Sequence, residues 1–258
     1  MENLNNLLIY TVAAGHYRDY VPLFKRCLEL QYPEYDYIVD EIETDNPILS
    51  ATLRFLLEPL GKHKYVYITD VDMFILREKP TLLDFHLKEM KEQGLCYSNS
   101  RRKREPRGSE RITGLHFVER EPWYKATSEA RRACLKTIKT EGYYTAPFSD
   151  ELMLQRIVLE SGLDLCGRTH LASRHHGIHI GLFKHYRLHS RETIKQQLTM
   201  RISPPVAQKW IQNYSDPEFA KIEVETRKKN KIIADELERL YAFCRKREKQ
   251  IKTWGKKV

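Results

Sequence analysis

The chain has 258 residues, of which 41% are hydrophobic and 31% are charged, as in a soluble globular protein. This length allows one large domain or two small ones. No run approaches the roughly 18 apolar residues of a membrane-spanning helix. The first residues, Met-Glu-Asn-Leu-Asn-Asn, lack the basic flank of a signal peptide. The five cysteines are scattered and form no C-x-x-C pair, which argues against structural zinc. We therefore expect a cytoplasmic protein, attached at most to a membrane surface.

The net charge of +9 raises the hypothesis of a nucleic-acid-binding protein. However, residues 221–258 contain thirteen Lys and Arg against six Asp and Glu, so most of the excess lies in this segment. Non-specific nucleic-acid binding requires a basic, aromatic-bearing face across the fold, whereas the rest of the chain is nearly neutral. We expect no nucleic-acid partner, and keep a non-enzymatic nucleic-acid-binding protein as an alternative.

The first predicted element is a strand over residues 7–14, Leu-Leu-Ile-Tyr-Thr-Val-Ala-Ala. Gly15 and a predicted helix over residues 19–30 follow it. A strand that runs into small residues and then a helix is the usual start of a nucleotide-binding α/β unit. A plain strand-turn-helix has the same pattern. No G-x-G-x-x-G sequence and no Walker loop occur, which disfavours a dinucleotide or P-loop site.

Two carboxylates follow another apolar strand, residues 65–69, Tyr-Val-Tyr-Ile-Thr. The period of two along a strand sends Asp70 and Asp72 to the same side of the chain. Ligands of open α/β sheets bind at the carboxyl ends of the strands. Two like charges there are costly unless a cation lies between them, and a hard divalent metal with phosphate oxygens fits this need. The alternative is a pair that caps a turn or binds Lys or Arg.

This arrangement resembles the D-x-D motif of nucleotide-sugar glycosyltransferases with the GT-A fold. The haloacid-dehalogenase phosphatases share part of the pattern, but they need the strand near the start of the domain and a downstream acidic pair. Here a βα unit precedes the motif and no Asp-Asp pair follows. The resemblance implies an α/β fold with a mostly parallel sheet flanked by helices. It also implies Mn²⁺ or Mg²⁺, held by Asp70 and Asp72 against the diphosphate of a UDP-sugar.

Further donor-binding residues are implied by the same resemblance. In this family the uridine lies at the end of the first strand, a basic residue projects from the helix before the D-x-D strand, and a small residue lies where the sugar passes. The matching residues here are Thr11, Val12, Ala13, Tyr17, Arg54, Val71, Thr113 and Gly114. Arg54 is alternatively a solvated or salt-bridged surface residue.

The other predicted elements up to residue 140 are strands at 35–40, 94–98 and 112–118, helices at 46–60, 81–93 and 121–140, and a basic loop at 100–111. The loop contains six Arg and Lys and is either solvated or an active-site lid or acceptor-binding loop.

A helix is predicted to begin after Ser149, a good N-cap, with Asp150 and Glu151 in its first turn. Acidic residues there are favoured by the helix dipole whatever the function. In GT-A enzymes an acidic residue at the equivalent position acts as general base in inverting enzymes, or positions the sugar in retaining ones. The resemblance therefore implies Asp150, and after it Glu151, as catalytic residues, with inversion slightly favoured.

Residues 174–186 contain four histidines and two glycines. This segment resembles the H-x-x-G-x-x-K-P-W segment of glycogenin-like and bacterial lipooligosaccharide galactosyltransferases, in which the His completes the metal coordination and the Lys contacts the diphosphate. The resemblance implies His179, or alternatively His176, as metal ligand, with Gly181 and Lys184 in the donor site. The spacing from His179 to Gly181 is one residue short, and Pro-Trp is replaced by His-Tyr. Two Asp and one His with open positions suit Mn²⁺. The alternative is a polar surface loop.

The C-terminal part is predicted to be helical, with one long charged helix over residues 218–252. We predict a GT-A catalytic domain at residues 1–190 and a basic helical extension at 191–258. The extension packs back on the domain, contacts a partner, or lies on an anionic membrane. The predicted activity is metal-dependent transfer of a sugar from a nucleotide to a glycan or lipid-linked acceptor. A metal-dependent nucleotidyltransferase is a further alternative.

Overall fold

The computed structural model describes residues 6–44, 47–102, 111–141, 149–167, 177–181, 183 and 202–254. The chain forms two compact units, each built from separate segments. Unit 1 consists of residues 1–15, 34–70 and 82–173, and unit 2 of residues 16–33, 71–81 and 174–258. Segments 16–33 and 71–81 thus group with the C-terminal helices. The predicted boundary at residue 190 lies outside the described residues and stays a prediction.

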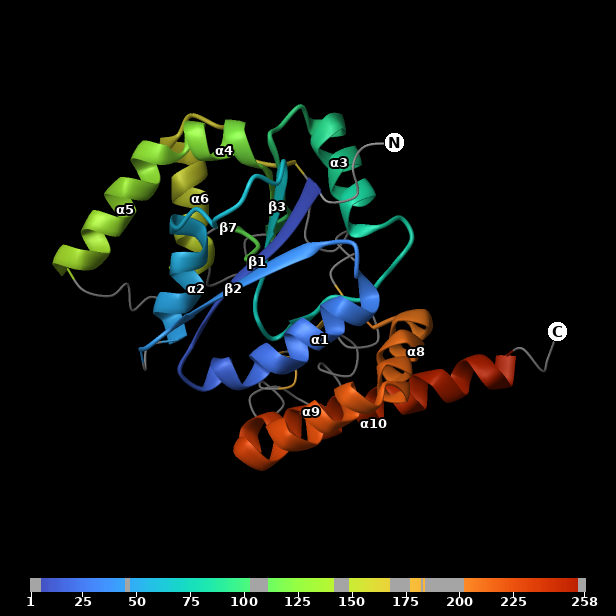
Figure 1. The fold of residues 1–258 in the computed structure, drawn as a ribbon. Coiled ribbons are helices and arrows are strands. Elements are labelled where there is room, and N and C mark those ends of the chain that lie inside the picture. The colour runs from blue at the N-terminus through green and yellow to red at the C-terminus, as the bar shows by residue number, and fades with distance from the viewer. Residues whose placement is uncertain are drawn as a thin grey trace. The chain divides into compact units, whose positions relative to one another are not determined.

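A five-stranded sheet with the order β2-β1-β3-β8-β5 forms the centre of unit 1 (Figure 1). Its strands are β1 (Leu7–Ala14), β2 (Asp36–Ile42), β3 (Tyr65–Ile68), β5 (Tyr97–Ser98) and β8 (His116–Glu119). Strands β2 and β3 pair parallel to β1, and β8 pairs antiparallel to both β3 and β5. Four strands therefore run in one direction, which confirms the predicted α/β class with a mostly parallel sheet.

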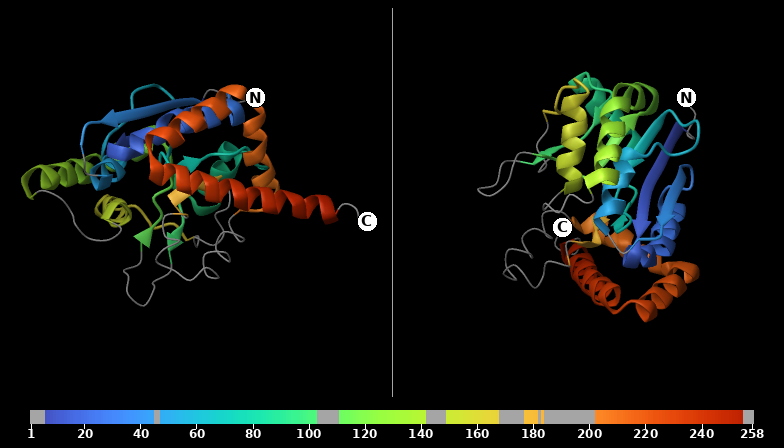
Figure 2. Two further views of the ribbon diagram at one scale, coloured as in Figure 1. Left: turned by 90° about the horizontal axis from the view of Figure 1, so that it is seen from below. Right: turned by 90° about the vertical axis from the view of Figure 1, so that its left-hand side faces the viewer.

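Helices cover the sheet of unit 1 because alternate side chains of each strand point to opposite faces. Its helices are α2 (Pro47–Leu56), α3 (Leu82–Gln93), α4 (Arg120–Ala126), α5 (Ser128–Glu141) and α6 (Ser149–Glu160). Leu8, Tyr10 and Val12 of β1 join one buried core with residues of α2, α4, α5 and α6. Helix α3 packs on other strand residues through His86, which stacks on Phe117. Figure 2 shows α5 and α6 side by side. Every residue of β1 is buried, as expected for a strand covered on both faces.

The predicted strand at 112–118 is wrong as a single element. The structure contains β7 (Arg111–Ile112), paired with β6 (Arg101–Arg102), and then β8. The break occurs because the backbone N–H of Thr113 donates to the carbonyl of Ser100 and the side chain of Asn99, which turns the chain between the two strands.

Unit 2 combines a two-stranded sheet with helices. Its elements are η2 (Gly15–Tyr20, of which Gly15 belongs to unit 1), α1 (Val21–Gln31), β4 (Met73–Phe74), β9 (Ile178–His179), α8 (Pro204–Gln212), η5 (Asn213–Ser215), α9 (Pro217–Lys229) and α10 (Lys231–Trp254). β4 pairs antiparallel with β9. Helix α1 is tied to the start of α9, where Arg26 donates to both carboxylate oxygens of Asp216 at 3.0 and 2.7 Å.

Two long helices were predicted as continuous and are each divided. The helix at 121–140 is α4 and α5, separated at Thr127. The helix at 218–252 is α9 and α10, because Asn230 is extended and its side-chain oxygen accepts from the N–H groups of Ile232 and Ile233. Asn side chains favour such caps over helix interiors. None of the described helices combines the length and the apolar character needed to span a membrane.

Candidate functional site

In unit 1, the buried Arg54 of α2 bridges two predicted site residues. Its Nη1 donates to Asp70, which follows β3, and its Nη2 donates to Asp150 on α6 at 3.0 Å. Burial raises the pKa of Asp150, and the Arg54 guanidinium partly offsets this by favouring the ionised form. The structure thus brings Arg54, Asp70 and Asp150 together, at the carboxyl end of β3.

Gly114 makes this approach possible. A Cβ at Gly114 would lie 2.7 Å from Nη2 of Arg54 and 3.5 Å from Oδ2 of Asp150. Any larger residue would therefore displace the guanidinium from its two carboxylates. Glycine at position 114 therefore leaves room for Arg54, and the predicted place of Gly114 in the passage of the donor sugar stays a prediction.

Glu151 has a different environment from Asp150, although both lie in the first turn of α6. Its carboxylate is paired with Nε of Arg111 and with Nη2 of Arg102 at 2.9 Å, and accepts from the N–H of Gly114 at 3.3 Å. Arg102 is the last residue of β6 and Arg111 the first residue of β7, so Glu151 links the two strands through its ion pairs with these arginines. These contacts are those of a bracing residue, and the predicted catalytic role of Glu151 stays a prediction.

Asn99 organises the turn that carries Thr113 and Gly114. Its oxygen accepts from the hydroxyl of Thr113 at 2.7 Å and from the N–H of Ser100 at 2.6 Å, while its nitrogen donates to the carbonyl of Thr113 at 3.0 Å. Its nitrogen also lies 2.9 Å from Nδ1 of His116, which is buried and whose pKa burial lowers to about 3. His116 is therefore a neutral core residue.

In unit 2, Asp72 and His179 form a second cluster. Nε2 of His179 lies 3.1 Å from Oδ1 of Asp72, and the carbonyl of Asp72 accepts from the N–H of Ile180 at 2.9 Å. The pairing of β4 with β9 places His179 opposite Met73, directly beside Asp72. Asp72 is buried and His179 is partly exposed. The predicted Asp–His pair is therefore assembled by strand pairing across more than one hundred residues of sequence.

Two glycines shape this cluster. A Cβ at Gly181 would lie 2.8 Å from Nε2 of His179 and 3.2 Å from Oδ2 of Asp72, so the absent side chain leaves room beside both ligand atoms. Gly177 has φ +73°, and a Cβ there would lie 1.9 Å from the carbonyl oxygen of Phe74. Only glycine allows residue 177 to approach β4 so closely.

The remaining predicted donor residues differ in environment. Thr11, Val12 and Ala13 lie in β1 and are buried; the hydroxyl of Thr11 has no hydrogen-bond partner among the described residues. Tyr17 lies in η2 of unit 2 and is half-buried, and Val71 is buried. Their contact with a nucleotide stays a prediction. The predicted residues His176 and Lys184 lie outside the described residues.

Sequence reasoning missed the residues that support this site. Arg102, Arg111 and Asn99 brace unit 1, and Gly177 admits β9 beside β4. Of these four residues, only Gly177 could have been found from the sequence, because it lies in the His-rich segment 174–186 that was predicted to bind the metal. The other three belong to a basic loop and a polar turn, where the sequence contains nothing that distinguishes a bracing residue from a solvated one.

Comparisons with known proteins identified no matching family model and no significantly similar curated protein. Among solved structures, the apo form of the glycosyltransferase GlyE of Streptococcus pneumoniae TIGR4 is similar, with a TM-score of 0.46 and 10% identity, over 74% of this chain. A second GlyE structure has a TM-score of 0.36 and 11% identity, over 58% of this chain. The chain spans 51% and 42% of the two GlyE chains.

Proposed function

We propose that this protein is a metal-dependent glycosyltransferase, which transfers a sugar from a UDP-linked donor to a hydroxyl of a glycan or lipid-linked acceptor. The observation that carries the proposal is the Asp72–His179 pair with the open space beside Gly181. Both residues of this pair belong to unit 2. The family resemblance of the D-x-D strand, taken from sequence, supplies the reaction.

The donor atoms fit a divalent cation of the Mn²⁺ type. Asp72 and His179 offer a carboxylate oxygen and an imidazole nitrogen. Asp70, two residues before Asp72 in the chain, adds a second carboxylate. Carboxylates and one imidazole with further positions open suit Mn²⁺. The space that a Cβ at Gly181 would fill supports this assignment, because the ligand atoms need room for an ion.

In the proposed reaction, the metal ligands, Asp150 and Arg54 have different roles. Bound at these ligands, a divalent cation would neutralise charge that develops on the diphosphate leaving group. Asp150 would accept the proton of the acceptor hydroxyl, and its raised pKa makes it a stronger base than an ordinary aspartate. Arg54 would orient Asp150 and Asp70 through its two hydrogen bonds.

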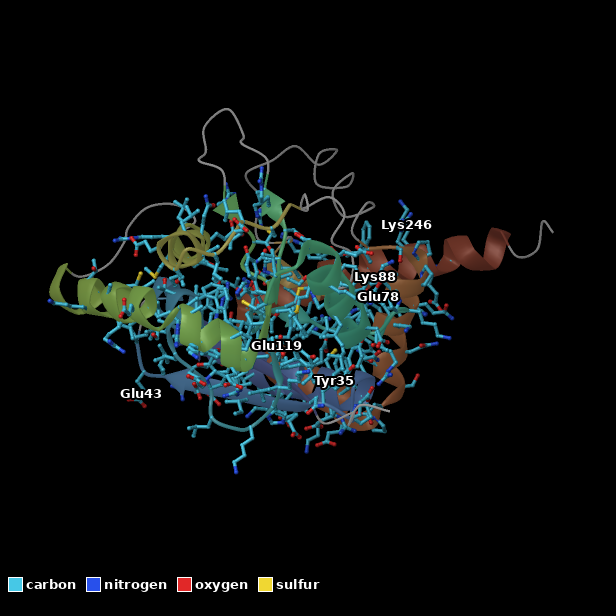
Figure 3. All side chains as sticks on the ribbon, turned by 90° about the horizontal axis from the view of Figure 1, so that it is seen from above. Tyr35, Glu43, Glu78, Lys88, Glu119 and Lys246 are labelled. Carbon is cyan, nitrogen blue, oxygen red and sulfur yellow. The ribbon has the colours of Figure 1, made fainter. Side chains whose placement is uncertain are left out.

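A lipid-linked acceptor and peripheral membrane contact are part of the proposal. Lys228, Lys229 and Lys231 are exposed around the α9–α10 junction, and Lys246 extends outward from α10 (Figure 3). Clustered exposed lysines are attracted to anionic lipid. Cosedimentation with vesicles that contain anionic lipid, and none with neutral vesicles, would support this part; equal binding to both would contradict it.

The proposal is tested by calorimetric titration of UDP with and without Mn²⁺. Wild type is compared with Asp72→Asn and with a matched control, Asp235→Asn, which removes a half-buried carboxylate from α10 of the same unit. We expect UDP binding that requires Mn²⁺, is lost in Asp72→Asn and persists in Asp235→Asn.

Turnover is then measured as UDP release from a panel of UDP-sugars. Loss of a general base lowers rates by about 10²–10⁴-fold, so Asp150→Asn is expected to bind UDP and Mn²⁺ normally while releasing UDP at such a reduced rate. Wild type that binds no UDP under either condition would refute the uridine donor. Binding of nucleoside triphosphates instead would favour a nucleotidyltransferase.

A further inference from the structure

Asp150 and Glu151 are consecutive carboxylates in the first turn of α6, and they have different neighbours. Successive side chains of an α-helix lie about 100° apart around its axis. Asp150 accepts from Nη2 of Arg54 on α2. Glu151 is paired with Arg102 of β6 and Arg111 of β7. The Asp150 side chain is 21% exposed and the Glu151 side chain 8%, so Asp150 is the more accessible to an acceptor hydroxyl.

The carboxylate of Glu151 is occupied by donors on both oxygens. Oε2 accepts from Nε of Arg111, and Oε1 lies 2.9 Å from Nη2 of Arg102 and 3.3 Å from the N–H nitrogen of Gly114. Burial raises the pKa of both Glu151 and Asp150, so the direction of the pKa shift does not distinguish the two carboxyls. The contacts do, because a carboxylate has about four acceptor sites and Glu151 uses most of them within the protein.

Gly114 connects Glu151 to Arg54. Its N–H donates to Oε1 of Glu151 at 3.3 Å. It also packs against Arg54, since a Cβ at Gly114 would lie 2.7 Å from Nη2 of that arginine. The same Nη2 donates to Oδ2 of Asp150 at 3.0 Å. A displacement of the Gly114 backbone would therefore move the group that orients Asp150.

Asn99 holds the same turn through the residue before Gly114. Its oxygen accepts from the N–H of Thr113 at 3.1 Å, and its nitrogen donates to the carbonyl of Thr113 at 3.0 Å. Asn99 and Glu151 together thus bind the backbone on both sides of the Thr113–Gly114 peptide bond. Leaving such buried backbone groups without partners is costly, so the two side chains fix the position of this peptide.

We infer that Glu151 is a positioning residue of the proposed reaction, which acts through Gly114 and Arg54 on Asp150. Its carboxylate holds the backbone against which Arg54 packs, and it anchors the first turn of α6 to β6 and β7. Of the two carboxylates, Asp150 accepts the proton. This inference rests on the proposed function, because it takes Asp150 to be the general base.

Two substitutions of Glu151 separate positioning from proton transfer, with turnover measured as UDP release from UDP-sugars. In Glu151→Gln the side chain cannot act as a base, but its amide oxygen still accepts from the N–H of Gly114. We expect kcat within about tenfold of wild type, against a loss of about 10²–10⁴-fold in Asp150→Asn. Glu151→Ala removes the hydrogen bond as well. It should lower kcat by about 10²-fold, as a misplaced catalytic group does, with little change in KM for the UDP-sugar.

A second measurement does not depend on turnover. In nitrogen–proton NMR spectra, the Gly114 amide reports its hydrogen bond to Glu151, and Nε–H of Arg54 reports the position of the guanidinium. We expect both resonances to shift in Glu151→Ala.

The chain offers a matched control in Glu223 of α9, which is 4% exposed, pairs with Arg227 and accepts from the hydroxyl of Tyr214 at 3.1 Å. Glu223→Gln and Glu223→Ala remove a similar buried carboxylate from unit 2. They should leave kcat and the resonances of Gly114 and Arg54 as in wild type.

A loss of kcat in Glu151→Gln as large as in Asp150→Asn would overturn the inference, because Glu151 would then be a proton acceptor. Unchanged Arg54 resonances in Glu151→Ala would also overturn it, as would equal losses of kcat in the Glu223 variants. Should Glu151→Ala not fold, as judged by near-ultraviolet circular dichroism, the comparison of Glu151→Gln with Asp150→Asn decides. Wild type that releases no UDP from any UDP-sugar would overturn the proposed function, and the NMR spectra would still decide whether Glu151 acts on Arg54.

Discussion

Gly181→Ala isolates the space beside the Asp72–His179 pair. The added Cβ would lie 2.8 Å from Nε2 of His179 and 3.2 Å from Oδ2 of Asp72. Favourable carbon contacts lie at about 3.5–4.0 Å, so the imidazole must move by roughly half an ångström or more. The backbone itself is not strained, because Gly181 is not among the glycines with positive φ.

The magnitude follows from how strictly metals require their geometry. Metal–ligand distances tolerate changes of about 0.2 Å, which is less than the displacement that the new methyl group imposes. We expect Mn²⁺ affinity to fall by about 10–100-fold, as for loss of a residue that orients a ligand. This equals about 1.4–2.8 kcal/mol of binding free energy. The free energy of unfolding should change by less than about 1 kcal/mol, because His179 is partly exposed and can yield.

The assay is a Mn²⁺ titration of wild type, Gly181→Ala and a control, Gly167→Ala. Gly167 is described in unit 1, has no positive φ, and a Cβ there would meet nothing within 4 Å. The control should bind Mn²⁺ as wild type does. If Gly181→Ala also binds Mn²⁺ with wild-type affinity, the metal does not occupy the space beside His179 and Asp72.

Three further predictions concern the support of the site. Arg54→Met should raise the pKa of Asp150 further, since Arg54 favours the ionised form of that carboxyl. NMR titration of the Asp150 carboxyl measures this pKa, and an unchanged value in the variant would contradict the prediction. Gly177→Ala should destabilise the fold by at least about 2 kcal/mol in urea unfolding, because alanine at positive φ is strained and its Cβ would overlap the carbonyl of Phe74; an unchanged midpoint would refute the contact. His116 has a lowered folded pKa of about 3, so its contribution to stability is present above pH 6.5 and is lost as pH falls toward 3, with a slope of up to about 1.4 kcal/mol per pH unit. His116→Leu should reduce that slope, and an identical slope would show that His116 does not titrate on unfolding.

The strands of unit 1 were predictable because their signal is local. β1 and β3 are apolar runs bounded by polar or small residues. Consecutive apolar side chains predict a strand that is buried on both faces. The acidic start of α6 was predictable for the same reason, since helix N-termini favour such residues. The breaks at Asn99–Thr113 and at Asn230 were not, because each depends on one side chain that accepts backbone hydrogen bonds.

By itself, the sequence determined the α/β class, the position of Asp70 and Asp72 after a buried strand, and the selection of His179, Arg54 and Asp150 as candidates. These features can be predicted because each depends on the periodicity and chemistry of residues that are close together in the sequence. Only the tertiary structure decided which candidates meet. Arg54 joins Asp70 and Asp150, and the pairing of β4 with β9 joins Asp72 and His179. It also decided that the C-terminal helices belong with β4 and β9. Such contacts join residues far apart in sequence, and they depend on how the elements pack, which no local pattern encodes.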